Sequence, residues 1–256
     1  MTLVRTLIAT ATLAIISATA PQAATLAEIQ KAGVFRVGTE GTYPPFTYHD
    51  ASGKLTGFDV AIARAIAARL GVKVEFLEGR WDGLIAGIDA NRYDAVINEV
   101  GITDARKQKY DFSQPYIASK AALIVRADDT DIKGFSDLNG KTAAQSLSSN
   151  YGAIATQNGA TLIGTDGFAQ SIALVLQHRA DATVNDSLSF LDFKKHKPEA
   201  PVKLAATLPN ADFSGVIIAK NQPELLAAIN DALDAMKADG TYLKISQEYF
   251  GEDVSK

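Results

Sequence analysis

The chain has 256 residues, of which 47% are apolar and 21% are charged, and its net charge is −4. These values are ordinary for a globular protein, and the mildly acidic balance argues against binding of nucleic acid or anionic membrane through bulk charge. The sequence contains no cysteine and only three histidines. Disulfides and thiolate metal sites are therefore excluded, and we predict no metal ion and no cofactor.

The N-terminus has the pattern of a secretory signal peptide, which we predict over residues 1–24. Residues 1–5 carry one cation, and residues 7–20 are apolar and uncharged. Cleavage is expected near Ala23 or Ala24, which yields a soluble periplasmic protein. The alternative is an uncleaved N-terminal anchor, although the apolar run is shorter than the roughly 20 residues that span a bilayer.

Strand and helix patterns alternate along the rest of the chain. Apolar residues at helical spacing predict a helix over 57–70 that ends at Gly71, and Asp82 is expected to cap a helix over 82–91. Alternating elements of this kind favour an α/β architecture with mostly parallel sheets. Strands are predicted at 34–38, 72–77, 93–98, 121–125, 142–145, 182–185 and 216–219, and further helices from 103 and at 150–158, 168–178, 188–195, 223–238 and 242–250.

A short internal repeat relates two parts of the chain. Residues 91–99 resemble residues 178–186, since both contain Arg-x-Asp-Ala and end on Asn and a carboxylate. We interpret the repeat as two equivalent α/β lobes, with chance or shared helix-to-strand chemistry as the alternative. Ligands of open α/β sheets bind at the carboxyl ends of strands. The pairs Asn98/Glu99 and Asn185/Asp186 are therefore predicted at the rim of a cleft.

Two charged residues lie where they suit a zwitterion. Arg106 is in the first turn of a predicted helix, where a cation is unfavourable unless an anion is bound. The alternative is a solvated basic face, because Lys107 and Lys109 are adjacent. Asp186 follows a strand and either accepts an ammonium group or caps the next helix.

Hydroxyls and aromatics complete the candidate set. Ser149 and Asn150 begin a helix and either cap it or hold an anion, and Tyr43 and Trp81 lie in strand-to-helix loops, where they flank a ligand or pack in the core. The sequence has no Gly-x-Ser-x-Gly, P-loop or Gly-x-Gly-x-x-Gly motif.

Several motifs together resemble the family 3 extracellular solute-binding proteins of ABC transporters. They are GTEGTYPPF (38–46), GKLTGFDV (53–60), WDGLI (81–85), ITDARK (102–107), YDFSQPY (110–116), MKADGT (236–241) and YFG (249–251). The resemblance covers nearly the whole mature chain. Within the family it is greatest to the cystine-binding branch, through residues 40–43, 81–83 and 96–98.

The resemblance implies a two-lobed periplasmic-binding-protein fold of type II, with hinge crossings near 117–120 and 213–216. Lobe 1 would comprise 25–117 plus 216–256, and lobe 2 would comprise 118–215.

It also implies roles for individual residues. Arg106 would clamp the α-carboxylate of the ligand with help from N–H groups near Ser149 and Asn150, and Asp186 would take the α-ammonium. The side-chain pocket would be lined by Tyr43 and Trp81. Asn98 and Gly101 would offer polar or backbone contacts.

Two residues depart from the pattern of many relatives. Glu99 stands where Ser, Thr or Gln is common, and Gly101 stands where Ser or Thr is common. Glu99 would favour a second ammonium group, as in cystine or a basic amino acid, unless strand alternation points it away from the ligand.

The resemblance therefore implies the periplasmic binding component of an ABC transporter. It would capture cystine or a similar polar amino acid as a monomer, perform no chemistry on it, bind no nucleic acid, and deliver the ligand to a membrane permease. The alternatives are a periplasmic enzyme of the same fold, such as a cyclohexadienyl dehydratase with Glu99 as a cleft acid, or a sensory module.

Overall fold

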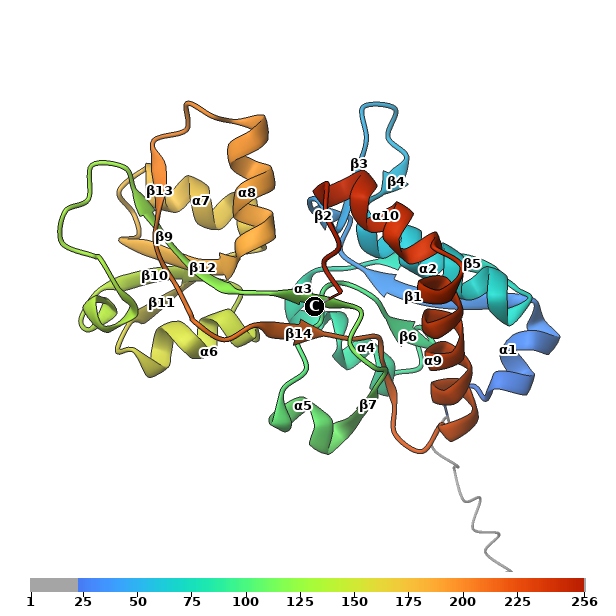
Figure 1. Ribbon diagram of the computed structural model, residues 1–256. Coiled ribbons are helices and arrows are strands. Elements are labelled where there is room, and N and C mark those ends of the chain that lie inside the picture. The colour runs from blue at the N-terminus through green and yellow to red at the C-terminus, as the bar shows by residue number, and fades with distance from the viewer. Residues whose placement is uncertain (1–22, 256) are drawn as a thin grey trace, which may run out of the picture.

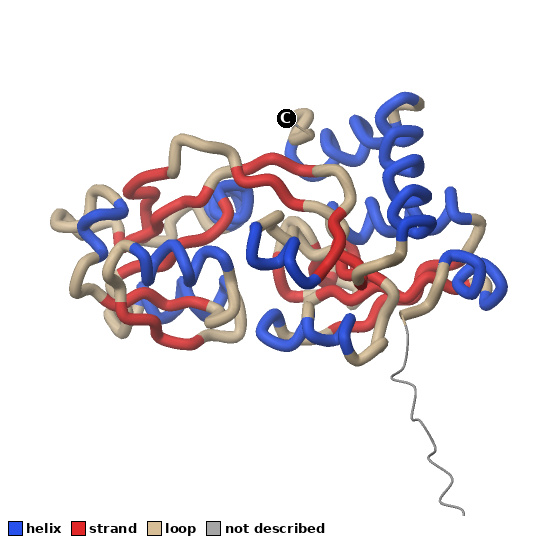
Figure 2. Tube along the Cα trace, turned by 90° about the horizontal axis from the view of Figure 1, so that it is seen from below, coloured by secondary structure: helices blue, strands red, loops and turns tan. Residues whose placement is uncertain are grey.

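The computed structural model describes residues 23–255, so nearly all of the predicted signal peptide lies outside the described residues. Figures 1 and 2 show two bodies side by side, each built on a five-stranded sheet. The sheet of lobe 1 has the order β5 (Lys73–Glu78), β1 (Val34–Thr39), β6 (Ala95–Val96), β15 (Ile217–Ala219), β7 (Tyr110–Phe112). The sheet of lobe 2 has the order β11 (Thr161–Gly164), β10 (Thr142–Gln145), β12 (Ala182–Asp186), β9 (Ala121–Arg126), β13 (Val202–Thr207).

Helices pack on both sheets, and a small antiparallel sheet extends lobe 1 (Figure 1). The small sheet consists of β2 (Thr42–Tyr43), β3 (Thr47–His49) and β4 (Leu55–Thr56). The helices of lobe 1 are α1 (Leu26–Ala32), α2 (Phe58–Leu70), α3 (Trp81–Leu84), α4 (Ala86–Asp89), α5 (Asp104–Lys109), α9 (Pro223–Ala238) and α10 (Thr241–Phe250). Those of lobe 2 are the 3₁₀ helix η1 (Phe135–Leu138), α6 (Asn150–Gln157), α7 (Phe168–Leu176) and α8 (Ser187–His196). Within 23–255, no helix is both long and apolar enough to cross a bilayer.

Two antiparallel strands connect the lobes. In β8 (Ile117–Ser119) and β14 (Asp212–Ser214), Ser119 pairs with Asp212 and Ile117 pairs with Ser214. The last described residues return to this crossing, where Ala118 N–H donates to the carbonyl of Val254 at 2.8 Å (Figure 1).

Both main sheets are mostly parallel, as predicted, and each contains one strand, β15 or β9, that runs antiparallel to its neighbours. In lobe 1, β1 is parallel to β5 and β6, whereas β15 is antiparallel to β6 and β7. Lobe 2 repeats this arrangement, with β10 parallel to β11 and β12, and β9 antiparallel to β12 and β13. The strands β9 and β15 directly follow the crossings β8 and β14 in the chain. They therefore run away from the crossing, opposite to the parallel strands that end near it.

The core of lobe 1 forms around α2, as the apolar periodicity predicts. Phe58, Ile62 and Ile66 are fully buried, and the helix ends at Gly71 in the left-handed conformation (φ 76°). Such a C-cap satisfies the last carbonyls of the helix, and glycine adopts it without steric cost. The helices α9 and α10 pack against α2 and complete this layer (Figure 1).

The helix predicted over 82–91 is wrong in extent and in its cap. The structure has two short helices, α3 and α4, and Asp82 makes no cap hydrogen bond there. The buried hydroxyl of Tyr93 donates to the carbonyl of Leu84, a carbonyl that a continuous helix would use itself. Tyr93 lies against Gly87, where a Cβ would be 2.1 Å from its hydroxyl. The strand predicted over 93–98 is also shorter in the structure, where β6 comprises only Ala95–Val96.

The internal repeat is confirmed in three dimensions. Asn91 and His178 occupy equivalent positions and both have positive φ, 51° and 57°. Asp94 accepts a hydrogen bond from the N–H of Arg36 on the neighbouring strand, and Asp181 accepts one from Thr142 in the same way, at 2.8 and 2.7 Å. The two segments therefore enter β6 and β12 through the same hydrogen-bonded turn.

Candidate functional site

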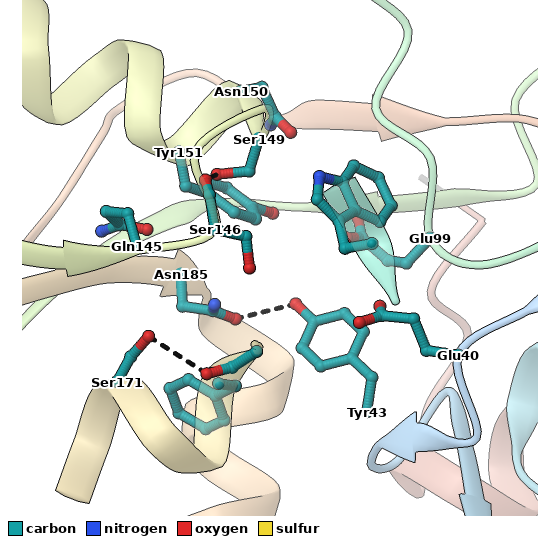
Figure 3. Close-up of a pocket in the computed structure, with 13 residues that line it drawn as sticks. Glu40, Tyr43, Glu99, Gln145, Ser146, Ser149, Asn150, Tyr151, Ser171 and Asn185 are labelled. Carbon is teal, nitrogen blue, oxygen red and sulfur yellow. Dashed lines mark hydrogen bonds between the residues drawn. The ribbon is translucent and has the colours of Figure 1, made fainter. Parts of the chain in front are cut away.

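A cavity lies between the lobes next to the crossing strands, and Figure 3 shows its walls. The space between its lining residues is about 450 Å³, which includes open solvent at its mouth. Five of the predicted ligand-binding residues line it, Tyr43, Trp81, Glu99, Ser149 and Asn150, as does Asn185, which was predicted at the cleft rim. The other lining residues are Glu40, Gln145, Ser146, Tyr151, Gly167, Phe168 and Ser171.

Arg106 provides a positive charge beside the cavity. Thr103 caps α5 by accepting the N–H of Arg106 at 3.2 Å, and Arg106 Nη1 donates to the carbonyl of Gly101 at 2.8 Å. The guanidinium carbon lies 5.2 Å from the ring centre of Trp81. Among residues 23–255, no carboxylate forms an ion pair with Arg106. Burial lowers the pKa of this guanidinium, yet an arginine side chain stays charged in proteins. A half-buried cation therefore remains free to bind an anion.

Two further donors lie near Arg106. The indole Nε1 of Trp81 is buried and has no hydrogen-bond partner in the described part of the chain. Asn150, the first residue of α6, likewise makes no side-chain hydrogen bond to any residue in 23–255. Ser149, by contrast, accepts the N–H of Gly152 at 2.9 Å, so the capping interpretation of Ser149 is confirmed.

Glu40 is a cavity carboxyl that we did not predict from the sequence. It lies directly after β1 and is 9% exposed, and Asn98 Nδ2 donates to Glu40 Oε2 at 2.7 Å. Asn98 Oδ1 also accepts the N–H of Glu40 at 2.7 Å. Burial raises the pKa of Glu40 to about 7, against the opposing effect of the Asn98 hydrogen bond. Asn98 is fully buried, so in this structure it holds Glu40 and does not line the cavity.

Glu99 is among the residues that line the cavity (Figure 3), and its contact with a ligand stays a prediction. The strand β6 ends before Glu99, which has a positive φ of 50°. Ser214 on the crossing strand β14 donates to Glu99 Oε1 at 2.7 Å. Burial and the nearby Asp186 carboxyl raise the pKa of Glu99 well above its ordinary value.

Asp186 lies beneath the cavity and does not line it. It is fully buried, and its Oδ1 accepts the N–H groups of Leu188 and Ser189 at 2.7 and 3.2 Å, which caps α8. Its Oδ2 accepts the hydroxyls of Ser119 on β8 and of Tyr151. The helix-capping interpretation of Asp186 is therefore confirmed.

The two Asn–carboxylate pairs of the repeat exchange roles. In lobe 1 the carboxyl of Glu99 lines the cavity and Asn98 lies beneath, whereas in lobe 2 Asn185 lines the cavity and Asp186 lies beneath. The two pairs differ because they lie at different places relative to their strands. Asn185 and Asp186 are still within β12, whereas Asn98 and Glu99 follow the end of β6 at Val96. Each buried carboxyl receives a serine hydroxyl from one of the crossing strands.

Most cavity-lining residues of lobe 2 were not predicted, because no motif or pattern in the sequence marks them as site residues. Gln145 ends β10, and the rule that ligands meet the carboxyl ends of strands would have included it. Gly167, Phe168 and Ser171 begin α7 and reach the cavity only because α7 packs on β10 and β12. Within residues 23–255, no cluster of three or more histidine, aspartate or glutamate side chains has the arrangement of a metal site.

Comparison with known proteins decides the family. Residues 35–252 match the bacterial extracellular solute-binding proteins, family 3. The chain belongs to this family. Among curated relatives, this solute-binding protein is 47% identical to the L-cystine-binding protein TcyA of Bacillus subtilis, over 90% of this chain and 86% of TcyA. It is 38% identical to the L-cystine-binding protein TcyJ of Escherichia coli, over 90% and 88% of the two chains.

Solved structures of similar proteins superpose on this chain to different extents. An ancestral arginine-binding protein bound to arginine has a TM-score of 0.80 at 39% identity, covering 85% of this chain and 98% of that one. The ancestral amino-acid-binding protein AncCDT-1, a precursor of cyclohexadienyl dehydratase, also scores 0.80, at 36% identity over 88% and 98%. The L-cystine solute receptor of Neisseria gonorrhoeae, unliganded and open, scores only 0.61 despite 47% identity over 91% and 100%.

Contacts between the lobes agree with a closed arrangement of this solute-binding protein. Asp82 of lobe 1 accepts both the N–H and the hydroxyl of Ser148 of lobe 2, at 2.9 and 2.7 Å. Arg80 pairs with Asp166 across the opening at 3.0 Å. The higher similarity to a ligand-bound protein than to a more identical open one therefore reflects the position of the lobes.

Proposed function

We propose that this protein is the ligand-capturing component of an ABC transporter. It binds a free amino acid between its lobes, performs no chemistry on it and presents the closed form to a membrane permease. The observation that carries the proposal is the unpaired guanidinium of Arg106 beside a cavity that two carboxyls line. We propose lobe limits of 25–117 plus 216–256 and 118–215, secretion through a signal peptide cleaved near Ala23 or Ala24, and action as a periplasmic monomer.

One end of the cavity suits the α-carboxylate of an amino acid. Arg106 lies in lobe 1, and Asn150 lies at the N-terminus of α6 in lobe 2. Charge-assisted hydrogen bonds contribute roughly 1.5–3 kcal/mol each. An anion that bonds to both lobes stabilises the closed form over the open form, because only the closed form offers both donors.

The number of charges favours a ligand with two ammonium groups. Glu40 and Glu99 both line the cavity, while Arg106 is the one cation we assign to the site. A simple neutral amino acid would neutralise only one of the two carboxylates. Cystine and a basic amino acid each carry two cationic groups, so the charges suit both, and the relatives TcyA and TcyJ are named for cystine. We assign one ammonium to Glu99, with Asp186 supporting it from beneath, and the other to Glu40.

A dehydratase is the alternative function, because AncCDT-1 is a precursor of that enzyme. The raised pKa of Glu99 also suits a general acid. Incubation with prephenate or arogenate distinguishes the two, since a dehydratase releases an aromatic product and a binding protein does not.

Thermal-shift and calorimetric measurements with a panel of amino acids test the proposal. The panel contains cystine, cystathionine, arginine, lysine, glutamine and aspartate. Cystathionine retains both heads of cystine but lacks the disulfide, so it separates recognition of the heads from recognition of the sulfurs. At equal ligand concentrations we expect the largest stabilisation with cystine. A concentration a hundred times its Kd would raise the free energy of unfolding by about 2.7 kcal/mol. If no amino acid stabilises the protein, the proposal is wrong.

A further inference from the structure

Asp82 follows Trp81 at the start of α3 in lobe 1, and its carboxylate contacts lobe 2. One oxygen, Oδ1, accepts both the N–H of Ser148 at 2.9 Å and the Ser148 hydroxyl at 2.7 Å. Among residues 23–255 these are the only hydrogen bonds of the Asp82 side chain, and neither goes to its own helix. The Asp82 carboxylate is therefore hydrogen-bonded to the described chain only while the lobes are close together.

Both segments that meet at this contact carry donors for the proposed ligand carboxylate. On the side of lobe 1, Trp81 precedes Asp82, and its ring centre lies 5.2 Å from the Arg106 guanidinium carbon. On the side of lobe 2, Ser148 lies two residues before Asn150, the first residue of α6. Asp82 itself is not among the residues that line the cavity. It thus joins two segments that present donors from opposite lobes, and it occupies no place at the ligand.

We infer that Asp82 acts as a latch between the lobes, because by holding Ser148 it keeps the start of α6 against lobe 1 while a ligand is bound. The inference rests on the proposed function, to which it adds a positioning residue. The contact slows ligand release, since it stabilises the closed form over the open form, in which Asp82 and Ser148 are apart. It does so for every ligand alike, because Asp82 lies outside the cavity.

The other polar contact at the opening contributes less. Arg80 and Asp166 form an ion pair at 3.0 Å, and their side chains are 77% and 61% exposed. Exposed ion pairs contribute little, because water and salt screen the two charges. Asp82 instead offers one charged acceptor to two donors, and charge-assisted hydrogen bonds are stronger than neutral ones. We therefore assign the latch to Asp82, and we expect Arg80→Ala to change ligand release less than Asp82→Ala does.

Stopped-flow measurement of cystine release tests the latch, and Trp81, the one tryptophan of the chain, provides a fluorescence signal beside the site. We expect Asp82→Ala to release cystine about tenfold faster than the unsubstituted protein, with little change in association. Asp82→Asn keeps an oxygen that accepts both hydrogen bonds and should restore most of the slow release. Asp231→Ala removes an exposed carboxylate of α9 in lobe 1, and as the matched control it should release cystine at the parent rate.

Comparison of ligands separates a latch from a ligand contact. Asp82→Ala should speed the release of every amino acid of the panel that binds by the same factor. Loss of a group that contacts the ligand would instead change the factor from one amino acid to the next, and this result would overturn the inference.

Ser148→Ala removes the hydroxyl donor and separates the latch from a local disturbance at α3. Alone it should speed cystine release about threefold, since one of the two hydrogen bonds remains. In the Asp82→Ala background it should have no further effect, because its partner has been removed. Parent-like release from Asp82→Ala, or an undiminished effect of Ser148→Ala in that background, would overturn the latch. An unsubstituted protein that binds no amino acid overturns the proposed function itself, and this result precedes any comparison of variants.

Discussion

The hydroxyl of Tyr43 in lobe 1 donates a hydrogen bond to Asn185 Oδ1 in lobe 2 at 2.7 Å (Figure 3). Both residues line the cavity, so this bond between the lobes is also part of the cavity wall. Tyr43 is 8% exposed, and its ring packs 5.2 Å from the ring of Phe46. The ring is held by lobe 1 and the hydroxyl by lobe 2. Closure of the two lobes therefore completes this part of the cavity wall, because the Tyr43–Asn185 hydrogen bond forms only when the lobes are close together.

Removal of this hydroxyl should weaken the closed form without affecting either lobe. We expect Tyr43→Phe to bind its amino acid about two- to tenfold more weakly, since a neutral hydrogen bond contributes roughly 0.5–1.5 kcal/mol net. Stopped-flow measurement of dissociation checks the effect. Tyr48→Phe is the control, because the Tyr48 hydroxyl makes no hydrogen bond within the described chain. Equal dissociation rates for Tyr43→Phe and the control would contradict the prediction.

Loss of the Arg106 guanidinium should abolish tight binding and leave the fold intact. Among residues 23–255 the side chain makes one hydrogen bond, to Gly101, and one contact with the Trp81 ring, so few native contacts depend on it. Removal of a bidentate charge-assisted contact costs about 3 kcal/mol or more, which corresponds to a hundredfold or greater loss of affinity. Calorimetry on Arg106→Ala measures this loss. Lys107→Ala, which removes an exposed cation from the same helix, should bind normally. Near-normal affinity in Arg106→Ala would refute the carboxylate site.

Ligand affinity should rise with pH between about 5 and 7. Burial raises the pKa of Glu40 to about 7, so the empty protein carries a proton there below that pH. A ligand ammonium placed beside Glu40 lowers this pKa, and binding then releases the proton. Because the proton and the ligand ammonium compete for Glu40, each pH unit below about 7 weakens binding by up to about tenfold for each proton released. Calorimetry in two buffers of different ionisation enthalpy counts the protons. Glu40→Gln should release fewer protons, and an unchanged count would exclude Glu40 as the second ammonium site.

The stability of the ligand-free protein should depend on pH through Asp59. Tyr116 donates to Asp59 Oδ1 at 2.8 Å, while Oδ2 is buried without a hydrogen-bond partner in 23–255. Burial raises the pKa of Asp59 to about 7, so the folded state binds the proton more tightly than the unfolded state. The free energy of unfolding therefore falls as pH rises from about 4 to 7, by at most about 1.4 kcal/mol per pH unit from this group.

An uncharged side chain at position 59 should make this profile less steep, while the raised pKa values of Glu40 and Glu99 keep part of the slope. We expect Asp59→Asn to be more stable than the parent protein at pH 8, with a smaller difference at pH 4. Urea denaturation at several pH values measures it. Asp231→Asn, on the exposed side of α9, should keep the parent slope. If the free energy of unfolding of Asp59→Asn depends on pH as steeply as that of the parent protein, a group other than Asp59 causes the pH dependence.

Local sequence patterns determined most of the helices and the candidate cleft residues of this protein, although not the helix predicted over 82–91. The spacing of Phe58, Ile62 and Ile66 predicted α2, and the repeat over 91–99 and 178–186 placed a polar pair after an equivalent strand in each lobe. The positions of Tyr43 and Trp81 in strand-to-helix loops made them candidates, and the family motifs then gave them a place in the side-chain pocket. These inferences succeed because helix periodicity, caps and strand-end turns depend on neighbours within a few residues.

Only the tertiary structure decided which of these residues face a ligand and which lie beneath it. Ser214 binds Glu99 across 115 residues of sequence, and Tyr43 binds Asn185 across 142. Asp186 turned out to be a buried cap, and Asp82, which was expected to cap a helix, bonds to Ser148 of the other lobe. No local pattern encodes such relationships, because they depend on where two sheets and two crossing strands bring distant side chains together.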